Sequence, residues 1–334
     1  MRLPLAVVPT LVCTLAALPA RAETDWFASL YTNEGIELRA DERVFALYAM
    51  LNAMGYDDAP VIRQLPVPAR EMHLVRLKAR AALRLESSEE EKLNSFFNGH
   101  PQSADEYGRY VLSLKGPPGF ERTPATPQDL KSFEGLLADG YSRLKLADLF
   151  ASVQDEYRAA LRSYHGALDA PVAAVRKLLK LKEDEPPRVV LVVNLLDGQG
   201  KAYSTRSAEE ELSVVVGPSK APDLYAVTRE VARSRIELLA AAKVGAGEAA
   251  AHAADLLSRA FAAVALSLSD SEVDERARAE GFAALKEWAK QVEGYSKGTA
   301  SLETFVAEAV PALLKELGKE PAAAPAAGKK PGKK

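Results

Sequence analysis

Two arginines flank a glutamate in the segment Arg229-Glu230-Val231-Ala232-Arg233, which lies in a stretch with helical periodicity. Residues four apart share one face of an α-helix, so two histidines at this spacing can bind one zinc ion while an intervening glutamate polarises the bound water. Arginine stays protonated in proteins and offers no lone pair to a metal. We therefore expect no metal at Arg229 and Arg233, and no cofactor elsewhere in the chain.

The secondary structure around this segment is predicted from the change between strand-like and helix-like hydrophobic patterns along the chain. The β-branched runs RVVLVVNLL at 188–196 and LSVVVGP at 212–218 favour short strands, and KAYSTRS between them favours a third. Helical patterns follow at 223–242 and 248–268, and the second of these contains Asp255. The arginine segment is thus expected on a helix that follows a small, mostly antiparallel sheet.

This order of elements resembles exported bacterial proteins related to the gluzincin metallopeptidases. The resemblance rests on VVNLL, VVVGP, the Arg-Glu-x-x-Arg helix and DLLSRA at 255–260, and the segments GFAALKEWAKQVEGY and SLETFVAEAVPALL resemble the closing helices of that group. The group carries its third zinc ligand, a glutamate, in a sequence similar to E-x-L-x-R-A, where Asp255 stands here. The resemblance implies a degenerate zincin-like region over 186–318 whose zinc ligands have been lost.

Our hypothesis for this region is that a former metal site has become an ion-pair cluster. A guanidinium of Arg229 or Arg233 would fill the space of the missing cation and pair with Glu230 or Asp255. The alternative is that these residues are ordinary solvated charges on an amphipathic helix. The two alternatives differ in whether the arginines face Asp255 or bulk solvent.

Three functions are compatible with these residues. The first is a non-catalytic pseudo-peptidase that binds an unknown protein or peptide partner or has a structural role. The second is a metal-independent hydrolase in which Glu230 serves as a general base, and the third is an all-α envelope adaptor whose strands are minor. A general base would need exact positioning, which the sequence does not show.

Other chemistry finds little support along the chain. The four histidines, His73, His100, His165 and His252, include no two within one helical turn, and His252 with Asp255 would need further metal ligands. There is no Walker loop and no G-x-G-x-x-G. The acidic runs at 89–91 and 209–211 are typical of solvated helix starts or loops.

Residues 1–22 have a basic start, an apolar stretch and an Ala20-Arg21-Ala22 end, which predict a secretory signal peptide cleaved near Ala22. The protein is then periplasmic or extracellular. The one cysteine, Cys13, would be removed, which excludes disulfides and thiol catalysis from the mature chain. Loss of Arg2 and Arg21 shifts the formal net charge from -3 to -5, which disfavours nucleic-acid binding.

The predicted fold class is α+β and predominantly helical. We expect a helical region at 23–185, the small sheet with zincin-like helices at 186–318, and a disordered Ala/Pro/Lys tail at 319–334. Its lysines could weakly contact an anionic envelope surface. Within these regions we expect a helix starting at Thr126-Pro127 and single helices at 146–164 and 272–294, and no transmembrane segment in the mature chain.

Overall fold

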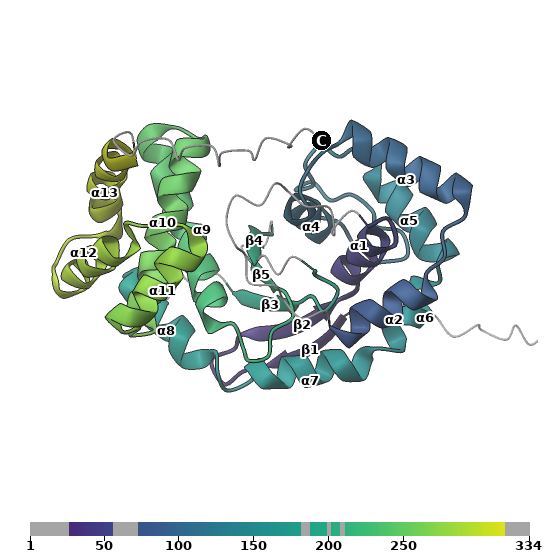
Figure 1. Ribbon diagram of the computed structural model, residues 1–334, viewed down its shortest axis with the longest axis horizontal. Helices are drawn as coiled ribbons and strands as arrows, with labels where there is room; N and C mark the ends of the chain where they lie inside the picture. The colour runs from purple at the N-terminus through teal and green to yellow at the C-terminus, as the bar shows by residue number, and fades with distance from the viewer. Residues whose placement is uncertain (1–26, 56–72, 182–187, 199–201, 208–210, 318–334) are drawn as a thin grey trace, which may run out of the picture.

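A computed structural model describes residues 27–55, 73–181, 188–198, 202–207 and 211–317 (Figure 1). The expected signal peptide at 1–22 and the expected tail at 319–334 lie outside these residues. The described part forms five strands: β1 (Phe27–Tyr31), β2 (Glu37–Asp41), β3 (Val189–Val193), β4 (Tyr203–Arg206) and β5 (Leu212–Val216). Helices make up most of the rest, so the predicted predominantly helical α+β class is confirmed.

The helices fall into an N-terminal and a C-terminal group on either side of the sheet (Figure 1). The N-terminal group is α1 (Glu42–Ala53), α2 (Leu74–Ala82), α3 (Ser87–Gly99), α4 (Ala104–Leu112), α5 (Phe133–Arg143), α6 (Leu146–Ala151) and α7 (Gln154–Tyr164). The C-terminal group is α8 (Asp169–Leu178), α9 (Leu224–Val244), α10 (Glu248–Ala265), α11 (Asp270–Glu280), α12 (Leu285–Lys297) and α13 (Leu302–Leu317). No helix in the described ranges has both the length and the apolar character needed to cross a bilayer.

The sheet has the strand order β1-β2-β3-β5-β4 and is mixed. The pairs β2–β3 and β3–β5 are parallel, and the outer pairs β1–β2 and β4–β5 are antiparallel. The expectation of a mostly antiparallel sheet is thus corrected. The chain leaves β2 through the N-terminal helices before it returns as β3, and such a long crossover allows neighbouring strands to run parallel.

Strands β1 and β2 lie within 23–185, the region expected to be helical. Strand β2 contains the charged residues Glu37 and Arg39, which are not typical of a buried strand. All five of its residues are nevertheless buried. The two side chains satisfy each other, since Arg39 Nε donates to Glu37 Oε1 over 2.8 Å. The sheet is therefore built from both regions and is central to the molecule, whereas the adaptor alternative treated the strands as minor.

Three predicted helix boundaries differ from the structure. The helix expected at Thr126-Pro127 begins at Phe133, because the Thr126 hydroxyl is used in a loop, where it donates to the Ser113 carbonyl over 3.0 Å. The stretch 146–164 is two helices, α6 and α7, separated at 152–153. The stretch 272–294 is also two helices, α11 and α12, because Gly281 caps α11 in the left-handed conformation at φ 77°.

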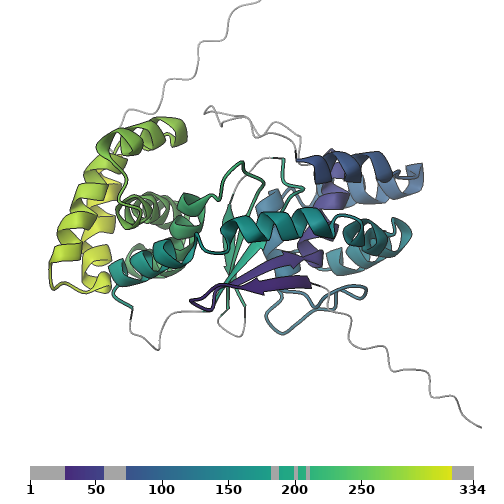
Figure 2. The same cartoon turned by 90° about the horizontal axis from the view of Figure 1, so that it is seen from below.

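Helices cover the sheet on both sides. Helix α7 lies along β2 and β3, beside the two N-terminal strands in the view from below (Figure 2). Helix α9 packs on β5 and β4, and α4 contacts β4. Strands β3 and β5 are buried over all five residues, which explains their uniformly apolar, β-branched sequences.

Helices α9 and α10 form a tightly packed antiparallel pair. They are joined by Gly245-Ala246-Gly247, where Gly245 has φ 85° and Gly247 has φ 156°, backbone conformations that favour glycine. Both helices contain small buried residues, including Ala232, Ala253 and Ala254, which allow close packing of the two backbones. This pair carries every residue of the predicted degenerate site.

Candidate functional site

Helix α9 holds the central residue of the site. It starts at Leu224, where the Asp223 carboxylate accepts a hydrogen bond from the Ala226 amide over 3.1 Å and so caps the first turn. The helix packs against β4 and β5, which turns Glu230 toward the sheet. Glu230 is fully buried, with an exposed fraction of 0%.

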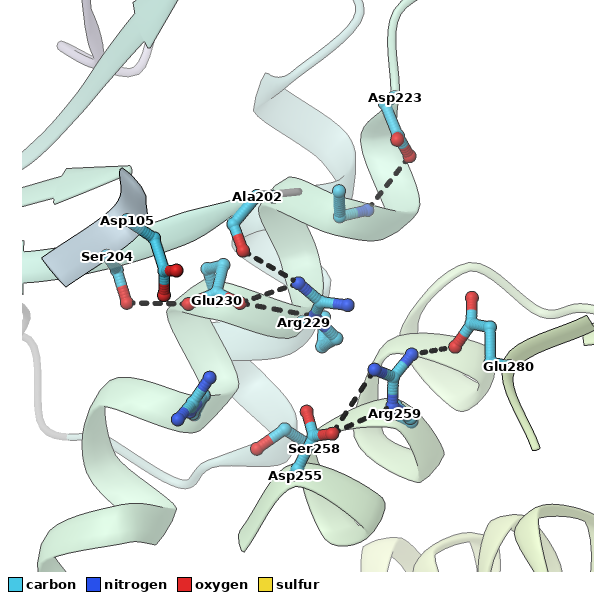
Figure 3. Close-up of polar contacts among 12 residues, drawn as sticks. Asp105, Ala202, Ser204, Asp223, Arg229, Glu230, Asp255, Ser258, Arg259 and Glu280 are labelled. Atoms are coloured by element: carbon cyan, nitrogen blue, oxygen red, sulfur yellow. Dashed lines mark hydrogen bonds and ion pairs between the residues drawn. The ribbon is translucent and has the colours of Figure 1, made fainter. Parts of the chain in front are cut away.

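Both carboxylate oxygens of Glu230 are engaged (Figure 3). The Ser204 hydroxyl, on β4, donates to Oε2 over 2.8 Å. The Arg229 guanidinium donates to Oε1 from Nη2 over 2.7 Å and from Nε over 3.2 Å. This buried acid is thus neutralised by a cation from its own helix and fixed by a hydroxyl from the sheet.

Arg229 is mostly buried, with 12% of its side chain exposed. Its Nη2 atom donates a further hydrogen bond to the Ala202 carbonyl over 3.2 Å. Burial by itself lowers the pKa of Arg229, but the neighbouring carboxylates of Glu230 and Asp255 outweigh burial, so the pKa lies above its ordinary value. The guanidinium is therefore a permanent positive charge inside the site.

Arg233 lies one turn further along α9 and takes no part in this arrangement. Its Nε atom pairs with Glu237 over 3.3 Å, again one turn away on the same helix, and the Glu237 side chain is 47% exposed. The two arginines thus diverge. Arg229 faces the sheet and α10, whereas Arg233 has the pairing typical of a surface helix.

Asp255 lies on α10 opposite Arg229, and its direct partner is Arg259 (Figure 3). Arg259 donates to Asp255 Oδ2 from Nη2 over 3.2 Å and from Nε over 3.3 Å, and it also forms an ion pair with Glu280. Burial lowers the pKa of Arg259, and the positive charge of Arg229 lowers it further. The carboxylates of Glu230, Asp255 and Glu280 therefore offset the repulsion between the guanidinium groups of Arg229 and Arg259.

The aromatic surroundings complete this cluster. The guanidinium of Arg259 lies 4.4 Å from the centroid of the Phe282 ring, and that of Arg276 lies 3.7 Å from the centroid of the Tyr225 ring. Stacking on aromatic faces suits the weakly hydrated guanidinium group in a partly buried place. Helices α9, α10 and α11 are joined here by charges and rings together.

The structure therefore brings Arg229, Glu230 and Asp255 into one electrostatic cluster and leaves Arg233 outside it. Sequence reasoning assigned no role to Ser204, Arg259 or Glu280. The Asp255–Arg259 pair carried a readable signal, because an acid four residues before a base lies on the same helical face. Ser204 carried none, because its contact with Glu230 joins a strand to a helix.

The four histidines lie on separate elements. His73 caps α2, with Nδ1 accepting from the Val75 amide over 3.2 Å, and His100 stacks on Phe96 with ring centroids 4.2 Å apart. His165 contacts the Tyr31 carbonyl over 3.0 Å, and the His252 ring lies 5.6 Å from that of Phe282. Among the described residues, no three His, Cys, Asp or Glu side chains are grouped so that they could hold a metal ion.

Comparisons of the chain with protein-family models, with curated proteins and with solved structures found no match. The resemblance to gluzincin-related proteins therefore stays a prediction from the quoted residues. What the site can do chemically follows from its own contacts.

Proposed function

We propose that this protein is a non-catalytic, exported binding or structural protein in which an ion-pair cluster stands in a degenerate metallopeptidase-like site. The observation that carries the proposal is the state of Glu230. It is fully buried, Arg229 occupies one of its oxygens, and Ser204 occupies the other.

This geometry argues against the hydrolase alternative. A general base must reach the proton that it abstracts, directly or through one water molecule. Both oxygens of Glu230 already accept hydrogen bonds, and the side chain has no exposed surface. Freeing the carboxylate would break the ion pair with Arg229 inside a buried site, which is strongly unfavourable.

The same contacts support a replacement of metal by guanidinium. A buried carboxylate needs a positive charge nearby, and Arg229 supplies it between Glu230 and Asp255. Such a cluster is expected where the fold around a lost metal has been retained for another purpose. In this proposal the partner is a protein or peptide of unknown identity, and nucleic acid is disfavoured by the acidic net charge.

Export belongs to the same proposal and rests on residues 1–22. Cleavage near Ala22 would release the chain to the periplasm or the extracellular space, and mass spectrometry of secreted protein would locate the new N-terminus. A mature chain that retains Met1 would overturn this part of the proposal. A weak contact of the Lys-rich tail with anionic surfaces is open to a vesicle-binding assay.

Metal content and hydrolysis together test the non-catalytic role. We expect untagged protein purified without chelator to contain no stoichiometric zinc, and to hydrolyse no peptide or ester in a broad substrate screen. Hydrolysis that is lost in Glu230→Gln would overturn the proposal, as would zinc bound at about one ion per chain.

The ancestry is tested separately by restoring the ligands. The triple variant Arg229→His, Arg233→His, Asp255→Glu places two imidazoles four residues apart on α9 and a glutamate on α10. We expect it to take up about one zinc ion per chain. The single variant Asp255→Glu is the matched control and should take up none. A folded triple variant that binds no zinc would count against a metallopeptidase origin.

A further inference from the structure

Among the residues that the structure describes, strand β4 forms one edge of the sheet, since the order ends with β5-β4. One hydrogen bond shows which backbone groups of β4 point toward β5 and which point away from it. The Ser207 amide donates to the Glu211 carbonyl over 2.9 Å. In an antiparallel pair, alternate residues turn both backbone groups toward the partner strand. Residues 203, 205 and 207 therefore face β5, and 202, 204 and 206 turn their amides and carbonyls toward the open edge.

Two of these outward carbonyls are each capped by an arginine. Arg229, on α9, donates from Nη2 to the Ala202 carbonyl over 3.2 Å. Arg109, on α4, donates from Nε to the Ser204 carbonyl over 3.1 Å. Positions 202 and 204 are neighbouring outward acceptors along one edge, so together the two arginines cover two acceptors that an incoming strand would use.

The two arginines approach this edge from opposite faces of the sheet. The Ser204 side chain points to α9, where it bonds Glu230 over 2.8 Å. The neighbouring Tyr203 side chain points to the other face, where the Arg109 guanidinium lies 5.4 Å from its ring centroid. Successive residues of a strand point to opposite faces, so α9 and α4 lie on either side of β4.

Both arginines are held in place by fixed partners. Arg229 is paired with the buried Glu230 over 2.7 Å, and Arg109 is paired with Asp105, one turn back on α4, over 2.9 Å. Gly108 allows α4 to lie this close, because a side chain there would collide with the Tyr203 hydroxyl. The caps are thus part of the packed structure on each face.

We propose that Arg109 and Arg229 lock the β4 edge against strand addition, and that the strand excluded is β4 of a second copy of this chain. An added strand must donate its amides to the outward carbonyls, which requires that both guanidinium groups leave. Leaving costs most at Arg229, because Glu230 would remain buried without its cation. The lock keeps the protein from pairing edge to edge, a hazard of any open sheet edge.

A second copy is the occupant that the geometry favours. Two β4 strands can pair antiparallel about a two-fold axis, since each presents the same outward groups at 202, 204 and 206. Every molecule in solution carries this strand at the concentration of the protein itself. The inference goes beyond the proposed function and stands whether or not the chain descends from a peptidase.

Self-association of unlocked variants tests the inference. Sedimentation velocity over a wide concentration range would compare wild type, Arg109→Ala, Arg229→Gln and the double variant. We expect the double variant to self-associate at least about tenfold more tightly than wild type. The matched control is Arg143→Ala, because Arg143 pairs with Asp139 one turn back over 2.9 Å, as Arg109 does with Asp105. The control should sediment as wild type does.

A proline locates the interface. Adding Arg206→Pro to the double variant removes an outward amide of β4, and proline is tolerated in edge strands. We expect the triple variant to return to the wild-type association state. Association that persists unchanged with the proline would overturn the assignment to β4, as would a folded double variant that stays monomeric.

The single variant Arg109→Ala keeps the test decisive if the double variant does not fold, because it leaves the pair of Arg229 and Glu230 intact. It opens the Ser204 carbonyl alone, and we expect self-association about threefold tighter than in wild type. Sedimentation identical to that of Arg143→Ala would overturn the lock.

Discussion

The guanidinium of Arg229 lies 2.7 Å from Oε1 of Glu230, the residue that follows it in the chain. Consecutive side chains on a helix diverge by about 100°, so such neighbours do not normally face each other. Here the long side chain of Arg229 extends along the surface of α9 to the carboxylate of Glu230, which points toward the sheet. The Arg229 side chain is 12% exposed and the Glu230 side chain is 0% exposed, so this is a buried ion pair.

Replacing Arg229 by methionine should strongly destabilise the protein. Glu230 would be left with Ser204 as its partner in a site without solvent. Breaking a buried pair by removing one member costs about 3–5 kcal/mol, because the remaining charge is uncompensated. Chemical denaturation would measure the loss. Arg233→Met is the matched control, since its partly exposed pair with Glu237 is expected to contribute less than about 1 kcal/mol. Equal losses in the two variants would contradict the assignment of Arg229 to the buried cluster.

Ser204→Ala should destabilise the protein by about 1–2 kcal/mol, because one oxygen of the buried Glu230 then loses its donor. The control is Ser163→Ala on α7, an exposed serine whose hydroxyl bonds the Ala160 carbonyl over 2.6 Å. We expect that variant to unfold at nearly the wild-type denaturant concentration. If the two serine variants behaved alike, the hydroxyl of Ser204 would not be holding Glu230.

The cap of α2 should make stability depend on pH. Burial lowers the pKa of His73, and Lys78 adds to this against the opposing charge of Glu156. A lowered pKa means that the fold favours the neutral ring, whose Nδ1 accepts from the Val75 amide. This contribution is present above the ordinary value of 6.5 and is lost as pH falls through the lowered pKa of the folded state.

The measurement for this effect is the unfolding free energy of wild type and His73→Asn at pH 7.5 and pH 5. Asparagine is a good cap that does not titrate in this range. We expect the wild type to lose more stability than the variant as the pH falls. A larger loss in the variant would contradict the capping role of the neutral ring.

Lys180 should anchor the C-terminal helices to α8. Its Nζ atom donates to the carbonyls of Gly298 over 2.9 Å and Ala300 over 2.7 Å, and it lies 4.2 Å from the centroid of the Tyr295 ring. Lys180→Met should cost about 1 kcal/mol and speed hydrogen exchange at the start of α13. Lys177→Met, at an exposed position on α8, is the control and should leave that exchange unchanged.

The helices at the site were predictable because their signals are local. Asp223 is a capping residue, and the two glycines at 245 and 247 separate α9 from α10, so both helices lie close to their predicted ranges. Strands β3 and β5 were predictable for a similar reason, since a buried parallel strand is a continuous apolar run. The start of the sheet was not predictable in this way, because β2 places Glu37 and Arg39 in buried positions. Their charges are offset there by each other and by Arg188 and Glu211 from distant parts of the chain.

The breaks within the predicted long helices had weaker signals. Gly281 ends α11 by adopting φ 77°, yet a glycine inside a helical pattern is often accommodated. Ser132 adopts a left-handed conformation at φ 83°, which serine rarely does, so packing rather than a local signal sets the start of α5.

The sequence by itself determined that residues 229 and 233 cannot ligate zinc, because arginine has no lone pair at any pH a protein experiences. It also placed both on one helix. Only the tertiary structure decided that Arg229 turns inward to Glu230 and Asp255 while Arg233 pairs with Glu237 near the surface. The physical reason is that one helical turn changes which neighbours a side chain meets. At 229 these are the edge of β4 and an acid on α10, and their contact depends on how distant parts of the chain pack.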